Sequence, residues 1–384
     1  MASTRISRTC AVGLSFVCAL ATSGCGGAND AGPAFGDVPV WTVGSTASIS
    51  IGALDGDPAY IFSHIEAVRF LPSGGVVVAD RSSGTLRVFD PTGRFERQMG
   101  GLGKGPGEFS WLGEMFVLPP DTIVAYDPDL FRLTRYLASG DLLSTLTFHV
   151  PDGYPDLYLG GYPDGSYGVA WIKQVPFDRD RLSADLMRIA RLGPDGSSAD
   201  VLGEQSGMRR LGSPLPFSPS FMAVMVGDTI FHSDGVGGLV IATGSAGDNL
   251  RSFAVAGDGV PVGEALRQLE SAVDSASALR LGELSSKVVL DTVPTLSDML
   301  VDGEGRLWLK RYAPATDSHW VLRLRTGGEW LVVQTDGTPV ARVRMPAGFR
   351  LMEVRGGRLA GVMHDDVGVE RVQVYASVDS LQTN

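Results

Sequence analysis

The chain has 384 residues, of which 43 are acidic and 32 basic, giving a formal net charge of -11 at pH 7. This acidic balance argues against nucleic-acid binding, which needs a positive surface to meet phosphate. Hydrophobic residues at 44% and charged residues at 20% are typical of a globular protein, and the 50 glycines indicate many tight turns between short strands.

Residues 1–24 predict an export signal peptide, with Arg5 and Arg8 before an apolar stretch that is too short to span a membrane. The segment from Thr22 to Cys25 resembles the lipobox of bacterial lipoproteins, with Thr22 where leucine is usual. The resemblance implies cleavage before Cys25 and lipidation of its thiol. The protein would then be anchored to a bacterial membrane, on its periplasmic or cell-surface side. An ordinary signal peptide with a spare cysteine is the alternative.

The residues around Cys25 carry two further expectations. Gly26 stands where lipoproteins kept at the inner membrane have Asp, so the resemblance implies the outer membrane if the cell has one. The other cysteines, Cys10 and Cys18, lie in the signal peptide, so a mature chain would form no disulfide. Residues 25–39, rich in Gly, Ala, Pro and Asp, predict a flexible tether ahead of a folded domain at 40–384.

The folded domain is dominated by apolar strands joined by turns. Residues 65–80 and 85–99 each read as a hairpin, which makes four successive strands of one sheet. The first hairpin turn recurs five more times along the chain. The six turns are Ser73-Gly74, Pro120-Asp121, Asp164-Gly165, Gly227-Asp228, Glu304-Gly305 and Gly356-Gly357. Such a repeat predicts an all-β fold, a six-bladed β-propeller of four-stranded antiparallel blades.

Two irregularities of the repeat carry predictions. Hydrophobic residues between Val262 and Leu284 have helical spacing, which predicts a short helical insertion at about 262–290, between blades four and five. The sixth blade has only three strands of its own. We therefore expect residues 46–51 to supply its outer strand and close the ring.

Blade one carries the clearest family resemblance. Residues 77–80, 86–90 and 93–95, followed by Gly100-Gly-Leu-Gly-Lys-Gly-Pro-Gly-Glu-Phe109, resemble the NHL repeat. Residues 40–377 as a whole are similar to bacterial six-bladed β-propeller lipoproteins of the NHL-repeat-like group, which implies the fold rather than a function. The glycines of 100–107 lack the Lys-Ser/Thr ending of a phosphate-binding loop and stand between two strands.

One face of the predicted propeller collects polar and aromatic residues, because the loops that enter each inner strand and leave the second strand meet there. A mixture of charges and aromatic rings suits a polar ligand. The candidate ligand-binding residues of this channel face are His64, Glu66, Arg81, Tyr126, Trp171, Lys173, His232, Asp234, Arg311, His364 and Asp365. Asp80 and Asp127 are expected instead to cap turns and to bond backbone N–H groups.

Metal binding is a second interpretation of this face. His64, His232 and His364 map to it from different blades, and three imidazoles could hold Zn²⁺ with an open position. The amidating lyases with NHL-type propellers are similar in this respect. The acidic pair Asp365-Asp366 is at most a weak cation site. No cofactor is predicted, and zinc or calcium is left open.

The sequence favours a membrane-tethered, extracytoplasmic binding or scaffold module for a protein or a small polar ligand. It contains no Gly-x-Ser-x-Gly motif and would keep no free cysteine after maturation, so nothing indicates catalysis. The alternative is a metal-dependent lyase or hydrolase resembling the NHL-type amidating lyases. A third hypothesis is an envelope component whose inserted helix docks a partner.

Overall fold

The computed structural model describes residues 38–173, 182–211, 213–271, 273, 278–279, 281–283, 290–317, 327–365, 368–375 and 378–380. The predicted signal peptide, Cys25, most of the tether and Asp366 lie outside the described residues. Everything below concerns the unit that begins at Ala31.

The first three sheets follow one another in chain order, each with its strands in sequence. Blade one consists of β3 (Ile65–Phe70), β4 (Val76–Asp80), β5 (Thr85–Phe89) and β6 (Phe95–Gly100). Blade two consists of β7 (Met115–Leu118), β8 (Thr122–Asp127), β9 (Arg132–Leu137) and β10 (Leu142–Thr147). Blade three consists of β11 (Gly153–Gly161), β12 (Tyr167–Lys173), β13 (Ser183–Leu192), β14 (Ala199–Leu211) and the short β15 (Ser213–Pro214).

The last three sheets repeat the arrangement and add strands from the chain ends. Blade four consists of β16 (Met222–Val226), β17 (Thr229–Ser233), β18 (Leu239–Thr243) and β19 (Asn249–Ala254). Blade five consists of β20 (Leu296–Val301), β21 (Leu307–Arg311), β22 (Gly328–Val333) and β23 (Pro339–Met345), extended by β1 (Val40–Val43) and β27 (Val378–Ser380). Blade six consists of β24 (Phe349–Arg355), β25 (Arg358–His364), β26 (Glu370–Tyr375) and β2 (Ile49–Ile51).

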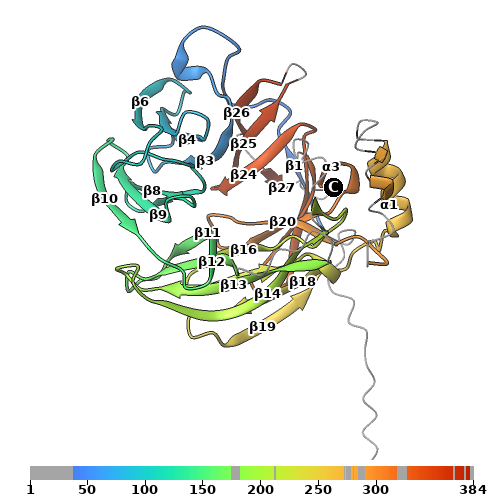
Figure 1. The fold of residues 1–384 in the computed structure, drawn as a ribbon. Coiled ribbons are helices and arrows are strands. Elements are labelled where there is room, and N and C mark those ends of the chain that lie inside the picture. Colours follow the sequence, from blue (N-terminus) through green and yellow to red (C-terminus); the bar gives the residue numbers. More distant parts are fainter. Residues whose placement is uncertain are drawn as a thin grey trace, which may run out of the picture. The chain divides into compact units, whose positions relative to one another are not determined.

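The six sheets make a six-bladed β-propeller, as the repeat of turns predicts. Figure 1 shows β3, β11, β16, β20 and β24 gathered about a common centre, with the later strands of each blade farther out. All six predicted turns join the first and second strands of a blade. Gly74 and Gly165 adopt φ values of 90° and 87°, a region that favours glycine, so these turns explain part of the glycine content.

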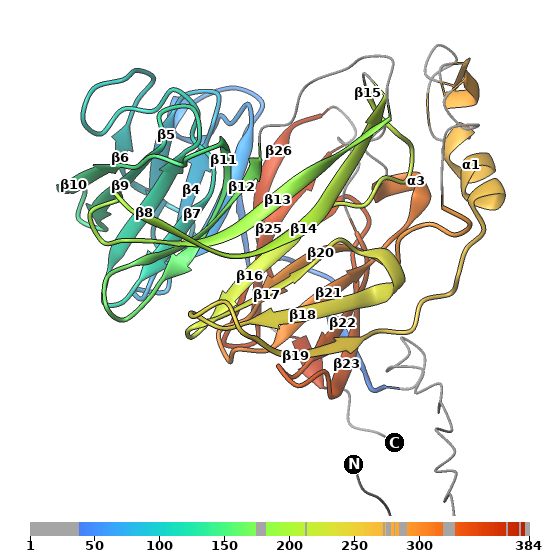
Figure 2. The same cartoon turned by 60° about the horizontal axis from the view of Figure 1, so that its bottom comes forward.

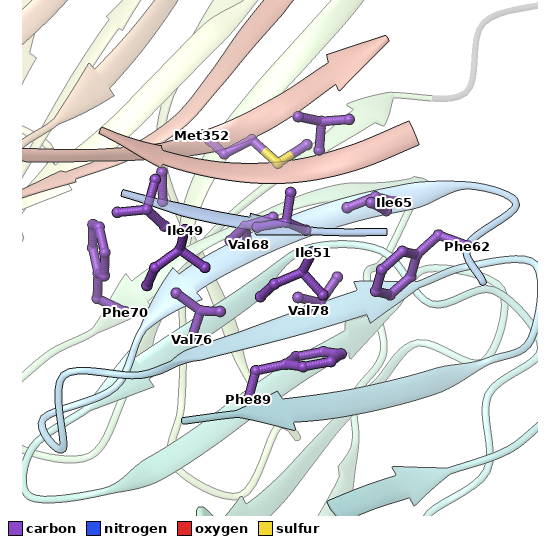
Figure 3. Packing of buried hydrophobic residues seen from close by; sticks show 14 residues of the cluster. Ile49, Ile51, Phe62, Ile65, Val68, Phe70, Val76, Val78, Phe89 and Met352 are labelled. Atoms are coloured by element: carbon purple, nitrogen blue, oxygen red, sulfur yellow. The ribbon is translucent and has the colours of Figure 1, made fainter. Parts of the chain in front are cut away.

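The hydrophobic core lies between the blades. Each pair of neighbouring blades shares its own cluster of buried side chains, because both faces of each twisted sheet are apolar. Figure 3 shows the cluster between blades six and one, where Ile49 and Ile51 of β2 lie near Val76, Val78 and Phe89. Packing of neighbouring blades therefore holds the ring together.

The ring closes as predicted. The outer strand of blade six is β2, which pairs antiparallel with β26 through Ile49↔Val374 and Ile51↔Val372. The sequence does not predict the further strand β1, which pairs in parallel with β23 and antiparallel with β27. The outer edge of blade five is thus covered by segments from both ends of the domain.

The predicted insertion is helical where it is described. Helix α1 (Val262–Glu270) follows blade four, and its Ala265 and Leu269 are buried against Phe217 and Tyr312. A second short helix, α3 (Pro314–Asp317), follows β21. Figure 2 shows α1 and α3 on the side toward which the long strands β13 and β14 extend. Among the described residues, no helix is both long and apolar enough to cross a membrane.

Candidate functional site: the central channel

The inner strands of all six blades enclose a central cavity of about 640 Å³. Ligand sites in proteins are typically concave and mostly apolar, and this cavity has the expected size. Its apolar lining includes Phe116, Leu157 and Phe221, and its charged lining includes Arg69 and Glu114. The charged groups stand beside these apolar side chains in the same concave space.

Three acidic residues stand at irregular positions near the same end of the inner strands of blades one, two and three. Glu66 and Asp156 occupy β-bulges, where the pairing of β3 with β4 and of β11 with β12 shifts by one residue. At Glu114 the backbone of Tyr126 bonds to both Gly113 and Glu114. A bulge re-aims a side chain that regular pairing would send between the blades.

Glu114 is the carboxyl group most affected by its surroundings. Its Oε2 accepts a hydrogen bond of 3.2 Å from the Tyr158 N–H. Burial raises the pKa of Glu114 to about 8, and the negative charges of Asp156 and Glu66 act in the same direction. Burial also raises the pKa of Asp156 to about 6, although water reaches this side chain. This sector of the channel is therefore electronegative and holds a proton at neutral pH.

Arg69 of β3 is one of two arginines among the described residues that line the cavity, the other being Arg355 of β24. One terminal nitrogen of Arg69 donates to the carbonyl oxygens of Val68 and Met352, at 2.9 and 3.0 Å, so the guanidinium spans blades one and six. Its carbon lies 5.7 Å from the centre of the Phe116 ring. Burial lowers the pKa of Arg69, while Glu353 and Glu114 partly compensate. Glu353 itself accepts from the Phe70 N–H and from Arg355.

Three predicted site residues contact one another in blade one. His64 Nε2 and an Arg81 terminal nitrogen lie 3.3 and 3.2 Å from Glu66 Oε2. The Arg81 guanidinium stacks over the ring of Trp111, 4.4 Å from its centre, and this ring is 43% exposed. These residues form an accessible polar group, as expected for the channel face.

The predicted residues of blade six lie beside this group. His364 Nε2 is 3.1 Å from Glu370 Oε1, and the other oxygen of Glu370 accepts from the Ile65 N–H of blade one. Asp365 accepts from the Val369 N–H at 2.8 Å and lies 3.4 Å from Arg371. Glu370 thus links the two blades, and the structure brings His64 and His364 near the same carboxylate.

Three of the predicted channel-face residues are buried between blades instead. Tyr126 stacks on Phe148 at 5.9 Å, and Trp171 is fully buried with its indole nitrogen 3.4 Å from Asp152. His232 bonds to Gln205 of blade three and, at 2.9 Å, to Thr243. For these residues the prediction of a ligand contact is wrong, because alternation along a buried strand sends them into the interface between blades.

The remaining predicted residues take part in local networks. Lys173 lies 3.9 Å from Glu204, and Asp234 accepts from the Val236 N–H at 3.0 Å. Arg311 pairs with Asp258 and Glu329. Asp80 and Asp127 bond to backbone N–H groups of their turns, as predicted; Asp127, for example, accepts from Asp129 and Leu130 at 3.0 Å.

The structure does not assemble the three-histidine centre. Both ring nitrogens of His232 are engaged between blades three and four, away from the interface that holds His64 and His364. Within the ranges described, no group of three or more His, Cys, Asp or Glu side chains has the spacing to hold a metal ion. Ala265 and Leu269 of α1 are packed inside the domain.

Sequence reasoning missed the charged residues that line the cavity and the nearby Asp156; the lining residues are Arg69, Glu114, Asp298, Asp302, Glu353 and Arg355. A usable signal existed for two of them. Glu114 and Asp156 are single acidic residues at the start of an apolar inner strand, as is Glu66, which was predicted. A polar residue in that position costs stability unless it reaches water or a partner.

Fold and cavity together define a six-bladed β-propeller with a charged central channel. A family model, DUF5128, described as a 6-bladed beta-propeller, matches residues 49–152. A solved protein described as exported, from Bacteroides fragilis, superposes with a TM-score of 0.50 at 13% identity, covering 89% of this chain and 99% of its own. A DUF4221 family member from Bacteroides vulgatus gives a TM-score of 0.51 at 10% identity, covering 86% and 97%. These likenesses support the fold alone. No curated protein matches the sequence.

Proposed function

We propose that this protein is an exported, lipid-anchored binding module whose central channel takes a small polar ligand. The N-terminal pattern, ending at Cys25, supports export and anchoring. Attachment by lipid would leave the propeller at the cell envelope, where it meets solutes outside the cytoplasm.

One observation carries the proposal of a channel ligand. The cavity of about 640 Å³ brings charged side chains, among them Arg69 and Glu114, together with an apolar wall in one concave space. Arg69 and Glu114 each make one backbone hydrogen bond to a neighbouring blade, and shared apolar clusters join the same blades. Buried charges are costly, and sites that bind polar molecules are where proteins most often keep them.

Binding in the channel can be tested by thermal shift with a panel of small solutes from four charge classes: sugars, carboxylates, amines and amino acids. Hydrogen exchange then locates the site. We expect a bound solute to slow exchange in peptides from β7, β11 and β16, whose backbones line the cavity. A panel without any stabilising solute, or protection confined to outer strands such as β10 and β19, would contradict the proposal.

Anchoring is tested separately, by mass spectrometry of the chain extracted from membranes. We expect an N-terminal peptide that begins at Cys25 and carries a diacylglycerol group. Cys25→Ala should abolish the modification and the partition into detergent, whereas the matched variant Cys18→Ala should retain both. An unmodified mature chain that begins elsewhere would favour the ordinary signal peptide.

A further inference from the structure

Arg69 is a cation without an ion-pair partner inside the cavity. No carboxylate oxygen of the described residues lies within 4.0 Å of its guanidinium nitrogens, although eighteen other pairs in the described part of the chain meet that criterion. Its two hydrogen bonds, to Val68 and Met352, use a single terminal nitrogen. A guanidinium has five N–H donors in a planar fork that fits a carboxylate at two points.

The nearby acids do not neutralise Arg69 in the empty protein. Glu353 is held by Phe70 and Arg355, and it acts on Arg69 only at longer range. Glu114 bonds to the Tyr158 N–H and is protonated at neutral pH. Folding has already removed water from the Arg69 guanidinium, so the cost of desolvating this cation is not incurred again on binding. An anion that hydrogen-bonds to it therefore adds a large favourable interaction. The unused edge of Arg69 thus suits an anionic group of a ligand.

The same cavity also contains a carboxyl group that could bind a cationic group of a ligand. Glu114 lines the cavity, and the charges of Glu66 and Asp156 bear on Glu114. An ammonium group that binds Glu114 displaces its proton and is also attracted by the nearby charges of Glu66 and Asp156. Phe116 and Phe221 supply apolar wall between and around the charged groups.

Resting on the proposed channel function, we propose that the ligand is a small zwitterion of the amino-acid class, with its carboxylate on Arg69 and its ammonium on Glu114. Each charged group of the ligand then meets a group of opposite charge that lines the cavity. A cavity of about 640 Å³ accommodates a free amino acid or a dipeptide.

The test is calorimetry on the full-length chain in detergent, with leucine, phenylalanine and glutamine as probes. For the tightest probe, the N-acetyl derivative removes the ammonium and the amide derivative removes the carboxylate. We expect each derivative to bind at least about tenfold more weakly than the free amino acid. Arg69→Gln should lower affinity for the amino acid and for its N-acetyl derivative. Glu114→Gln should lower affinity for the amino acid only.

Proton linkage provides a second readout. Glu114 loses its proton when the ammonium binds, so the affinity should rise by up to about tenfold per pH unit between pH 6 and 8. In Glu114→Gln this dependence should be lost. Arg94→Gln, which alters an exposed arginine in the outer hairpin turn of blade one, should leave binding unchanged. Arg69→Lys keeps the positive charge and serves as a second variant if Arg69→Gln does not fold.

The outcomes separate the inference from the proposed function. If the N-acetyl derivative binds as well as the free amino acid, or if Arg69→Gln and Arg69→Lys both bind normally, the zwitterion site is wrong. If the three amino acids fail while another charge class protects β7, β11 and β16, the channel still binds a ligand and only the inference falls. If no class binds, both fall.

Discussion

The interface between blades six and one differs from the interface between blades three and four. Blades three and four are adjacent in sequence and share a small apolar cluster that includes Leu159, Ile189 and Ile230. Their main described polar link is the neutral contact of His232 with Gln205. Blades six and one share a larger cluster that contains Ile49 and Ile51 of the closing strand β2.

The closing interface also carries ionised links. Glu353 and Glu370 of blade six accept from backbone N–H groups of blade one, and Arg350 donates to the Ile65 carbonyl. In the other direction, Arg69 donates to Met352. Charge-assisted hydrogen bonds are about twice as strong as neutral ones. The difference teaches that ring closure through a strand of three residues is reinforced by charged groups, and some of these also reach the channel.

The largest expected effect is at the closing strand. Ile51→Ala should lower the free energy of unfolding by about 2–5 kcal/mol, because Ile51 is 1% exposed and its removal leaves a cavity. Chemical denaturation measures the loss. Ile189→Ala, at the interface of blades three and four, should cost a similar amount. Only Ile51→Ala should make residues 52–63 sensitive to protease, since these residues connect β2 to blade one. Equal cleavage in both variants would contradict a special role for closure.

A smaller effect is expected from Glu370. Glu370→Ala should destabilise the protein by about 1–3 kcal/mol, because the Ile65 N–H loses its acceptor in a buried place. Glu204→Ala is the matched control: Glu204 is paired with Arg188 and Lys173 but is 40% exposed, so its loss should cost less than about 1 kcal/mol. Similar costs for the two variants, measured by denaturation at pH 7, would show that closure does not depend on the charged link.

The sequence is sufficient to predict the number of blades, because each blade repeats a tight turn between two apolar strands, and five of the six turns contain glycine. It also predicts the role of residues 49–51, because blade six lacks a strand. It does not predict β1, since residues 40–43 have no periodic partner and their pairing with β23 is set by distant packing. The strand propensity of single residues is a weak guide to pairing at the edge of a sheet.

The candidate site is predicted less well, for a geometric reason. His64, Glu66 and Arg81 contact one another as expected, because they lie at strand ends whose position follows from the turns. Tyr126 and Trp171 lie inside their strands, one and two positions from the end, where alternation decides the face. The bulges at Glu66 and Asp156 shift that alternation, and a single sequence does not reveal them.

The smallest expected effect is at His232, whose neutral hydrogen bond with Gln205 links blades three and four. Burial lowers the pKa of His232 to about 4, whereas an unfolded histidine titrates near pH ~6.5. Between these values the unfolded chain binds more protons, so this link loses stability as the pH falls from about 6.5 to about 4. His232→Asn, which cannot be protonated there, should cost about 1 kcal/mol at pH 7.5, and the difference from the wild type should shrink toward pH 4.5.

The control for the substitution itself is His149→Asn, which replaces an exposed histidine in the same way. Thermal unfolding between pH 4.5 and 7.5 measures all three proteins. A constant gap between His232→Asn and the wild type would mean that His232 is not kept neutral by its place between the blades. In that case, the interface of blades three and four would depend on charge as the closing interface does, and the contrast between the two would fail.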